Sequence, residues 1–298
     1  MLAPGSISEQ QIALVEFTWA RALADAGAFW PCVAQHFLAE GADITLLFEP
    51  LSADLGTLVE APVAQVLAGL RSPERLLPKL QSWGAQLALQ GLVESDYMAA
   101  GGALLAGLAQ VLGEEYSQPV HGTWSLVIRQ VTQALLTGAR QVREPLGPLT
   151  VRQRRLVQAS WALIMVDEAV RLRFGRIWFG EWFARAPWLR TLFADDTTEQ
   201  QGRLVAALDE IVHGLTAWSQ LAGRLEQLGL RHHGYGVQAA DYASLGRALL
   251  SALNQCLRAR FTPELRSYWG EVYSAVADAL QGSGAAARLA RAQPSSAR

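Results

Sequence analysis

Two adjacent histidines, His232 and His233, are the residues of this chain whose type and setting best suit chemistry. They lie near the end of a helical pattern, in the run Leu-Gly-Leu-Arg-His-His-Gly-Tyr-Gly-Val from 228 to 237. A neutral imidazole nitrogen can bind a metal ion or carry a proton, although a histidine in a helical protein is more often a surface residue or a satisfied core residue. One step along a helix turns the side chain by about 100°. Only one of the two histidines can therefore face a given partner.

Composition limits the classes of protein that this chain can belong to. It has 298 residues, of which 51% are hydrophobic and 17% are charged, enough apolar material for one large domain or two ordinary ones. Cys32 and Cys256 lie far apart and form neither a Cys-x-x-Cys pair nor a disulfide framework, which favours a reducing, cytoplasmic location. The first residues show no basic run before an apolar core, and 18 apolar residues never follow one another. We expect neither secretion nor a membrane span.

Charge is divided unevenly along the chain. Residues 1–145 carry 7 Arg and Lys against 14 Asp and Glu, whereas residues 146–298 carry 18 against 13. The arginines of the basic half are scattered along amphipathic segments and are not clustered with aromatic residues, so we do not expect nucleic-acid binding. Opposite charges can favour association of the two halves, an effect that is modest and screened by salt.

Apolar residues recur three and four positions apart almost throughout, which is typical of an all-α protein. Such series in the second half are Val157, Trp161 and Ile164; Leu204, Leu208, Ile211 and Leu215; and Leu245, Leu249, Leu253 and Leu257. Thr262 followed by Pro263 predicts a helix start, because threonine caps a helix and proline suits its first turn. We expect breaks at 186–187, 194–196 and 234–236.

An internal repeat appears when the chain is shifted by 145 residues against itself. Positions of glycine, tyrosine, tryptophan and leucine then coincide without a gap. The matched pairs include Gly84 and Gly229, Gly91 and Gly236, Tyr97 and Tyr242, Gly101 and Gly246, Leu108 and Leu253, and Trp124 and Trp269. This register indicates a tandem duplication. Breaking residues at 137–148 mark the joint, so we expect domains at 1–140 and 141–282, followed by a disordered tail at 283–298.

Several ordered motifs in the second copy match one known family. The run 228–237 is followed by Asp241 and Tyr242, and upstream the segment Trp-Phe-Gly-Glu-Trp-Phe at 178–183 precedes Pro187. Over residues 147–281, the chain resembles bacterial globins, including the globin domains of flavohaemoglobins. The resemblance implies two tandem globin folds.

The same resemblance implies a cofactor, haem b, with one group per chain in the second copy. His232 matches the proximal ligand of the haem iron. Gln200 matches the distal residue, whose amide N–H can donate a hydrogen bond to a gas molecule across the iron. The other haem-contacting residues expected from the resemblance are Phe179, Phe193, Leu204, Arg231, Tyr235, Val237 and Tyr242.

Neighbouring residues compete for both iron-facing positions. The His-x-x-Tyr-Gly spacing favours His232 over the histidine that follows it. Placing Gln200 in the pocket also turns Leu204 inward, whereas choosing Gln201 would turn Asp209 inward. Gln200 is therefore the better distal candidate, although a solvated glutamine remains the alternative.

The second copy departs from the flavohaemoglobin pattern at two positions. Phe179 stands where those proteins have a distal tyrosine, and Gly284 stands where they have a glutamate after the tyrosine of the last helix. Tyr242 and Tyr273 are candidates for orienting His232 through a hydrogen bond, with a purely structural bond as the alternative. An incomplete proximal relay lowers the expectation of peroxidase or oxygen-activating chemistry.

The first copy lacks the residues that would hold an iron. Leu87 falls at the position of the expected ligand, and Leu55 falls at the distal position. Its histidines, His36 and His121, align away from the expected pocket. Pro62 falls within the presumed distal helix, where it removes a backbone donor, and we expect it to kink that helix. This copy resembles the haem-free globin modules of some bacterial regulatory proteins, with either a collapsed core or an apolar ligand.

Gas binding is the function that these residues favour, with O2, NO or CO as the ligand and the first copy as a structural or regulatory module. The alternatives are a gas or redox sensor that signals through the haem-free copy to a partner, and a nitric-oxide dioxygenase. Because no glycine-rich dinucleotide fingerprint follows a strand, a dioxygenase would need a separate reductase. A homodimer is a further possibility.

Overall fold

The computed structural model describes residues 7–143, 147–193 and 196–292, and these contain α-helices and short 3₁₀ helices but no strand. Contacts within the chain divide it into two compact units, Met1–Glu144 (unit 1) and Pro145–Arg298 (unit 2). The division lies inside the segment 137–148, where the sequence predicts the joint. The prediction of an all-α protein is confirmed.

Each unit is a succession of helices. Unit 1 contains α1 (Glu9–Leu23), α2 (Ala26–Ala39), α3 (Ala42–Phe48), η1 (Glu49–Asp54), α4 (Leu55–Gly69), α5 (Pro73–Leu89), α6 (Glu94–Leu112), η2 (Gly113–Glu115) and α7 (Gln118–Ala139). Unit 2 contains α8 (Val151–Met165), α9 (Glu168–Arg185), η3 (Pro187–Leu192), α10 (Thr198–Gly214), η4 (Leu215–Ala217), α11 (Trp218–Gly234), α12 (Ala239–Leu257), η5 (Arg258–Arg260) and α13 (Pro263–Ala292).

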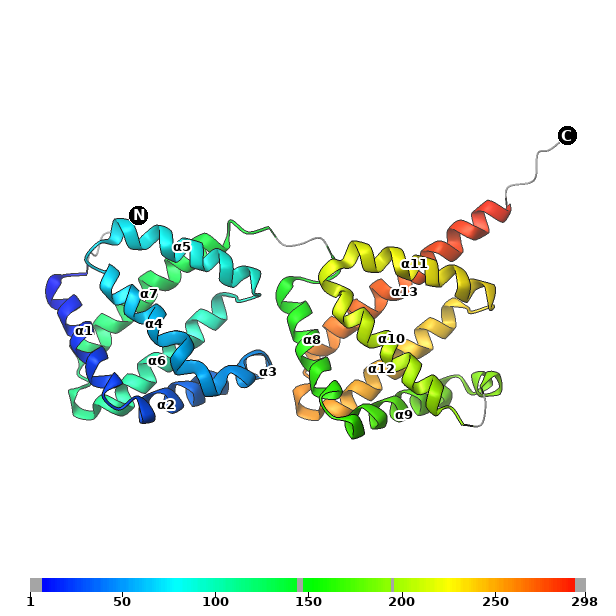
Figure 1. Ribbon diagram of the computed structural model, residues 1–298, viewed down its shortest axis with the longest axis horizontal. Coiled ribbons are helices and arrows are strands. Elements are labelled where there is room, and N and C mark those ends of the chain that lie inside the picture. Colours follow the sequence, from blue (N-terminus) through cyan, green and yellow to red (C-terminus); the bar gives the residue numbers. More distant parts are fainter. Residues whose placement is uncertain (1–6, 144–146, 194–195, 293–298) are drawn as a thin grey trace. The chain divides into compact units, whose positions relative to one another are not determined.

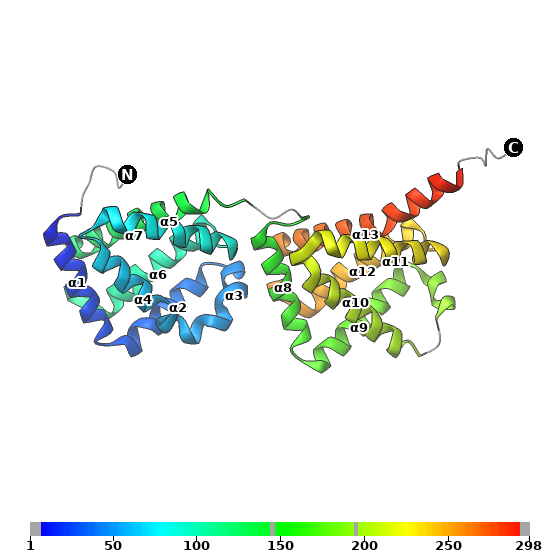
Figure 2. The ribbon, with the colours of Figure 1, turned by 45° about the horizontal axis from the view of Figure 1, so that its top comes forward.

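The two units repeat one arrangement (Figure 1). In unit 1, α2 packs on α6 and α5 packs along α7; in unit 2, α9 packs on α12 and α11 packs along α13 (Figure 2). Helices α5 and α6 begin and end 145 residues before α11 and α12 do. Both units therefore have the same fold, which confirms the predicted duplication of one helical architecture.

Local signals in the sequence fix several helix ends. Thr262 accepts a hydrogen bond from the backbone N–H of Leu265 at 3.2 Å, and α13 begins at Pro263 as predicted. Helix α9 ends before Pro187, and α11 ends at Gly234, which confirms two of the predicted breaks. Gly236 follows with φ 82°, a backbone conformation that favours glycine. The third predicted break includes residues 194 and 195, which lie outside the described residues.

Glycines let the backbones of paired helices approach closely. A Cβ atom on Gly84 would lie 1.9 Å from the carbonyl oxygen of Leu135 in α7. A Cβ atom on Gly229 would lie 2.0 Å from the carbonyl oxygen of Leu280 in α13. Any larger residue would force the helices apart. Gly84 and Gly229, which match in the 145-residue register, therefore make the same close backbone contact in the two units.

A buried tryptophan joins the first and last helices of each unit. The indole N–H of Trp124 in α7 donates to the Thr18 hydroxyl of α1 at 2.9 Å. In unit 2 the indole N–H of Trp269 in α13 donates to the Ser160 hydroxyl of α8 at 3.0 Å. Both tryptophans are almost fully buried, so the hydroxyl satisfies a donor that has no access to water.

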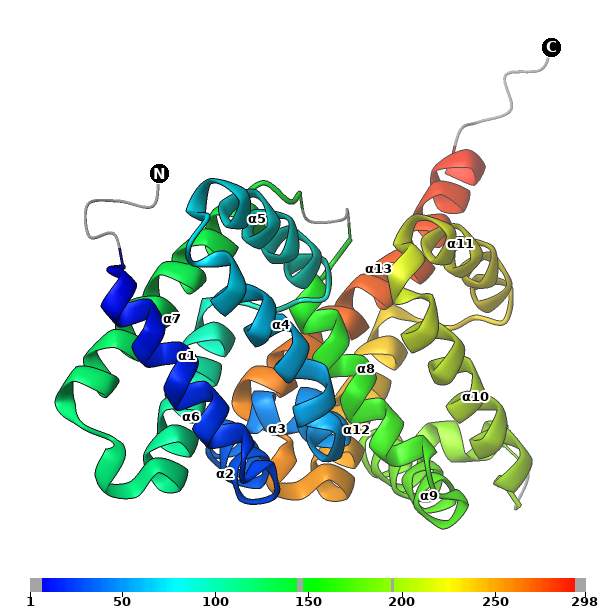
Figure 3. The same cartoon turned by 60° about the vertical axis from the view of Figure 1, so that its left-hand side comes forward.

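One element differs from the sequence-based expectation. Helix α13 continues to Ala292, beyond the predicted end of the domain at 282, and its last turns extend past α11 (Figure 3). Ala, Leu and Arg dominate residues 285–292, and these residues favour the helix. Residues 293–298 of the predicted tail lie outside the described residues. Pro62 lies inside α4, within the helix where the sequence places it.

Candidate functional site

The side chain of His232 is held in a defined orientation in the last turn of α11. Its Nδ1 atom lies 3.0 Å from the backbone carbonyl oxygen of Leu228, one turn earlier in the helix. A carbonyl oxygen can only accept, so Nδ1 carries the proton and Nε2 keeps its lone pair. The imidazole thus keeps Nε2 as the nitrogen that could bind a metal ion.

Gln200 lies in the first turn of α10 and brings a polar atom into a buried setting. Its side-chain oxygen is buried, and no described residue forms a hydrogen bond with it. A buried polar atom without a partner is costly, and it is typical of a place that a ligand or water completes. Amide oxygen and nitrogen can exchange by a 180° flip, so the same position can also offer an N–H donor.

The neighbouring Gln201 faces a different surface. Its amide nitrogen donates to the Thr197 hydroxyl at 2.9 Å. Its Cβ atom would lie 3.5 Å from a Cβ atom built on Gly175 of α9. Gln201 therefore fills the contact between α9 and α10, which supports Gln200 as the distal candidate of the pair.

Aromatic rings from α9 and the following segment form an apolar cluster. Phe179 is 3% exposed, and its ring centroid lies 5.9 Å from that of Phe193 in an edge-to-face arrangement. The ring centroid of Phe183 lies 5.6 Å from that of Phe179 and 5.5 Å from that of Phe193. The ring centroid of Trp182 lies 5.8 Å from those of both Phe179 and Phe193. The cluster provides flat, apolar surface suited to a large planar ligand.

Two hydrogen bonds tie this cluster to α12. The indole N–H of Trp182 donates to the Ser244 hydroxyl at 3.0 Å, and that of Trp178 donates to the carbonyl oxygen of Leu245 at 3.2 Å. The sequence analysis assigned no role to Phe183 or Ser244. Phe183 stands four residues after Phe179, a spacing that places both on one helix face and could have revealed it. No signal in the sequence singles out Ser244.

Tyr242 and Tyr273 do not orient His232 through the predicted hydrogen bond. The Tyr273 hydroxyl instead donates to the backbone carbonyl oxygen of Tyr242 at 2.6 Å, while His232 uses the Leu228 carbonyl. Of the two alternatives that the sequence leaves open, the structural bond is the one that forms. Burial raises the pKa of both phenols, so both remain neutral. The Tyr242 ring still lies near the imidazole, with 6.4 Å between centroids.

The remaining predicted contacts divide into buried and exposed residues. Leu204 and Val237 are half-buried, at the second turn of α10 and after the turn that ends α11. Arg231 is exposed in the last turn of α11. Tyr235 is 82% exposed, because it lies on the outside of that turn, next to Gly236. The haem contact expected of Tyr235 therefore stays a prediction for a side chain at the surface of unit 2.

The corresponding region of unit 1 contains different side chains at the matching positions. Leu87 stands two residues before the end of α5, as His232 does in α11, and Leu55 begins α4. Trp30 of α2 packs against Gly56 of α4, where an added Cβ atom would meet the indole at 2.7 Å. In unit 2 the equivalent contact joins Gly175 of α9 and Gln201 of α10. The larger side chain therefore comes from α2, the first helix of the pair, in unit 1 and from α10, the second helix, in unit 2.

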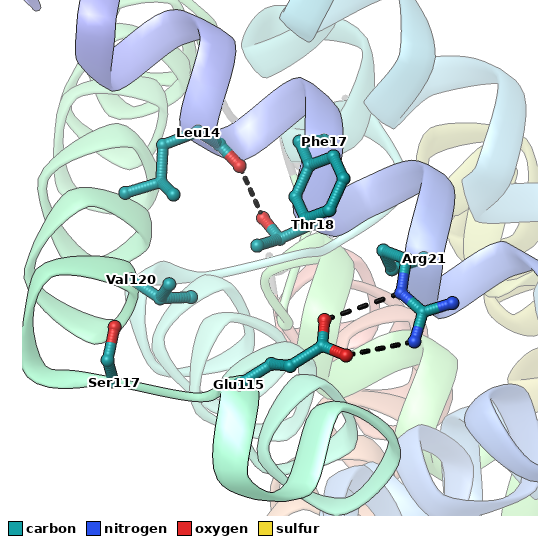
Figure 4. Close-up of a pocket in the computed structure, with 7 residues that line it drawn as sticks. All are labelled: Leu14, Phe17, Thr18, Arg21, Glu115, Ser117 and Val120. Carbon is teal, nitrogen blue, oxygen red and sulfur yellow. Dashed lines mark hydrogen bonds and ion pairs between the residues drawn. The ribbon is translucent and has the colours of Figure 1, made fainter.

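The side chains that line a surface hollow of about 680 Å³ in unit 1 offer fewer groups that could bind a ligand than the site in unit 2 does (Figure 4). Its charged groups already pair with each other, since the Arg21 guanidinium donates to the Glu115 carboxylate at 2.9 Å. The Thr18 hydroxyl donates to the Leu14 carbonyl at 2.8 Å. Elsewhere in the described part of the chain, no group of three or more His, Cys, Asp or Glu residues could hold a metal ion, and no helix is long and apolar enough to cross a membrane.

Comparisons with known proteins identify the class to which unit 2 belongs. Residues 177–280, which include every candidate site residue named above in unit 2, match the globin family. The chain is 26% identical over 146 residues to neuroglobin of Dissostichus mawsoni, neuroglobin-1 of Oncorhynchus mykiss and neuroglobin of Danio rerio. Each alignment covers 44% of this chain and 90% of the relative. Unit 2 contains a globin domain.

These relatives are eukaryotic, so they do not support the bacterial subtype that the proximal segment resembles. Globin domains hold haem between helices, with a histidine nitrogen on the iron. The residues present fit that group. His232 offers an oriented nitrogen, the ring cluster around Phe179 offers apolar surface, and Gln200 offers a buried polar atom that lacks a partner.

Proposed function

We propose that unit 2 binds one haem b and that His232 is the axial ligand of its iron. The observation that carries this proposal is the hydrogen bond from His232 Nδ1 to the Leu228 carbonyl oxygen. That bond sets the tautomer, raises the basicity of Nε2 and limits rotation of the ring. Leu204, Val237, Phe179 and Phe193 are the apolar contacts we assign to the porphyrin, and Arg231 is the residue we assign to a propionate.

The proposed function is reversible binding of a diatomic gas, O2 and by the same chemistry NO or CO. When bound, haem supplies an iron atom with a coordination position for such a ligand. We assign Gln200 to the distal side of the site, where its amide would donate a hydrogen bond. The buried setting strengthens that bond, because few waters compete for it. Phe179 excludes water but donates no hydrogen bond.

For unit 1 we propose a haem-free structural or regulatory role. Leu87 and Leu55 carry no nitrogen or oxygen donor, and the Trp30 indole occupies the contact between α2 and α4. A sensor, in which gas binding to unit 2 changes the interaction of unit 1 with a partner, is the second candidate. It is favoured by the retention of a complete helical unit without an iron ligand.

Absorption spectroscopy of the purified chain tests the proposal. Ferric, ferrous and CO-treated samples should each show the bands of a histidine-ligated haem b, and titration with O2 should be reversible. A colourless protein that takes up no added haem would overturn the proposal. A spectrum that does not respond to CO or O2 would retain the cofactor and reject gas binding.

A further inference from the structure

A groove of about 520 Å³ follows the contact between α6 and α7 on the surface of unit 1. Its floor is apolar and includes Met98, which is 63% exposed. The other apolar and small lining residues are Gly101, Gly102, Leu105, Ile128 and Leu136. Exposed methionine is a flexible apolar side chain that adapts to a packing partner.

The equivalent face of unit 2 carries larger side chains at two positions. Tyr273 replaces Ile128, and its ring covers Gly246 so closely that an added Cβ atom would meet it at 2.4 Å. Arg247 replaces Gly102. The same pair of helices thus supports both versions of this surface, and at these two positions unit 1 has the smaller residue.

The two rims of the groove carry opposite charges. Glu94 lies on the α6 rim, whereas Arg129 and Arg140 lie on the α7 rim. A two-fold axis along the groove would place the α6 rim of one copy against the α7 rim of another. Each acidic rim would then meet a basic rim, twice per dimer, with the apolar floors between them. Such an isologous interface uses one surface on both copies.

We propose that this groove is the surface through which two copies of the chain associate. The exposed Met98 and the half-buried leucine and isoleucine side chains supply the apolar contact. Gly101 and Gly102 allow close approach of α6, because no side chain projects from them. The rim charges fix the orientation of the two copies. None of the residues that line the groove belongs to the haem site proposed for unit 2.

Sedimentation equilibrium of the full chain over a wide range of concentrations tests the proposal. We expect a monomer–dimer equilibrium. The double variant Gly102→Arg, Ile128→Tyr copies the side chains of unit 2 into the groove, so it should preserve the fold and weaken dimerisation by at least about tenfold. Gly122→Arg, at an exposed glycine of α7 outside the groove, is the matched control and should leave the equilibrium unchanged.

A charge exchange tests the predicted orientation. Glu94→Arg and Arg140→Glu should each weaken dimerisation by placing like charges together, and the double variant should restore it. A wild-type chain that stays monomeric at the highest concentration would overturn the proposal, as would a dimer that neither set of variants affects. Haem absorbance, read in the same samples, should be unchanged throughout, which separates this test from that of the proposed function.

Discussion

Unit 1 and unit 2 use the same framework and differ where a ligand would sit. Both tie their first and last helices together with a buried tryptophan, Trp124 or Trp269, that donates to a hydroxyl. Both also repeat an aromatic contact, with ring centroids 5.2 Å apart for Phe37 and Phe48 and 5.8 Å apart for Trp182 and Phe193.

The candidate site changes without disturbing that framework. Leu87 stands where unit 2 has His232, and the bulky side chain at the contact of α2 with α4 comes from Trp30 instead of Gln201. The tryptophan hydrogen bonds that both units share therefore do not depend on His232 or Gln200. One helical framework can be kept while its site is gained or lost.

The largest expected effect is at the position where the two units differ most. His232→Ala should remove most of the bound haem or leave it dependent on added imidazole, because the axial nitrogen is gone. His233→Ala is the matched control and should keep the wild-type spectrum. Pyridine haemochrome quantitation against protein concentration measures both variants. If the His233 variant lost haem and the His232 variant kept it, the ligand would be assigned one residue too early.

The shared tryptophan bond predicts a similar loss of stability in the two units. Ser160→Ala and Thr18→Val each remove the acceptor of a buried indole N–H and should each lower the free energy of unfolding by about 1–3 kcal/mol. Urea denaturation followed by tryptophan fluorescence measures the change. Ser219→Ala, at an exposed position, should change it little. A large effect in only one unit would show that the two frameworks are not energetically equivalent.

Gln200 should have a smaller effect that is confined to ligand binding. Gln200→Leu removes one hydrogen-bond donor and should speed O2 dissociation about fivefold, equivalent to about 1 kcal/mol. Gln201→Leu should leave the rate nearly unchanged, since that amide bonds to Thr197. Stopped-flow displacement of O2 measures both rates. An unaltered rate in the Gln200 variant would place its amide outside the ligand pocket.

The smallest expected effect is in unit 1. Leu87→His supplies a nitrogen at the matching position but should leave the haem content at one per chain, because the Trp30 indole remains packed between α2 and α4. The haem-to-protein ratio is again the measurement, with the wild-type chain as the control. A second haem in this variant would show that the axial ligand alone distinguishes the two units.

Periodic and local features were readable from the sequence. The apolar spacing predicted helices, the 145-residue register predicted the duplication, and Pro187, Pro263 and Gly236 predicted helix boundaries that the structure confirms. These features depend on backbone preferences and on which face of a helix avoids water, and both are set by residues close together in the chain.

Partner choice was decided by the tertiary structure. The sequence placed Tyr273 near the proximal side, but its acceptor is the Tyr242 carbonyl, a matter of how α12 and α13 cross. Whether Gln200 or Gln201 faces α9 depends on the Gly175 contact. Hydrogen bonds extend only about 3 Å. Small differences in helix placement therefore choose between candidates that the sequence leaves equal.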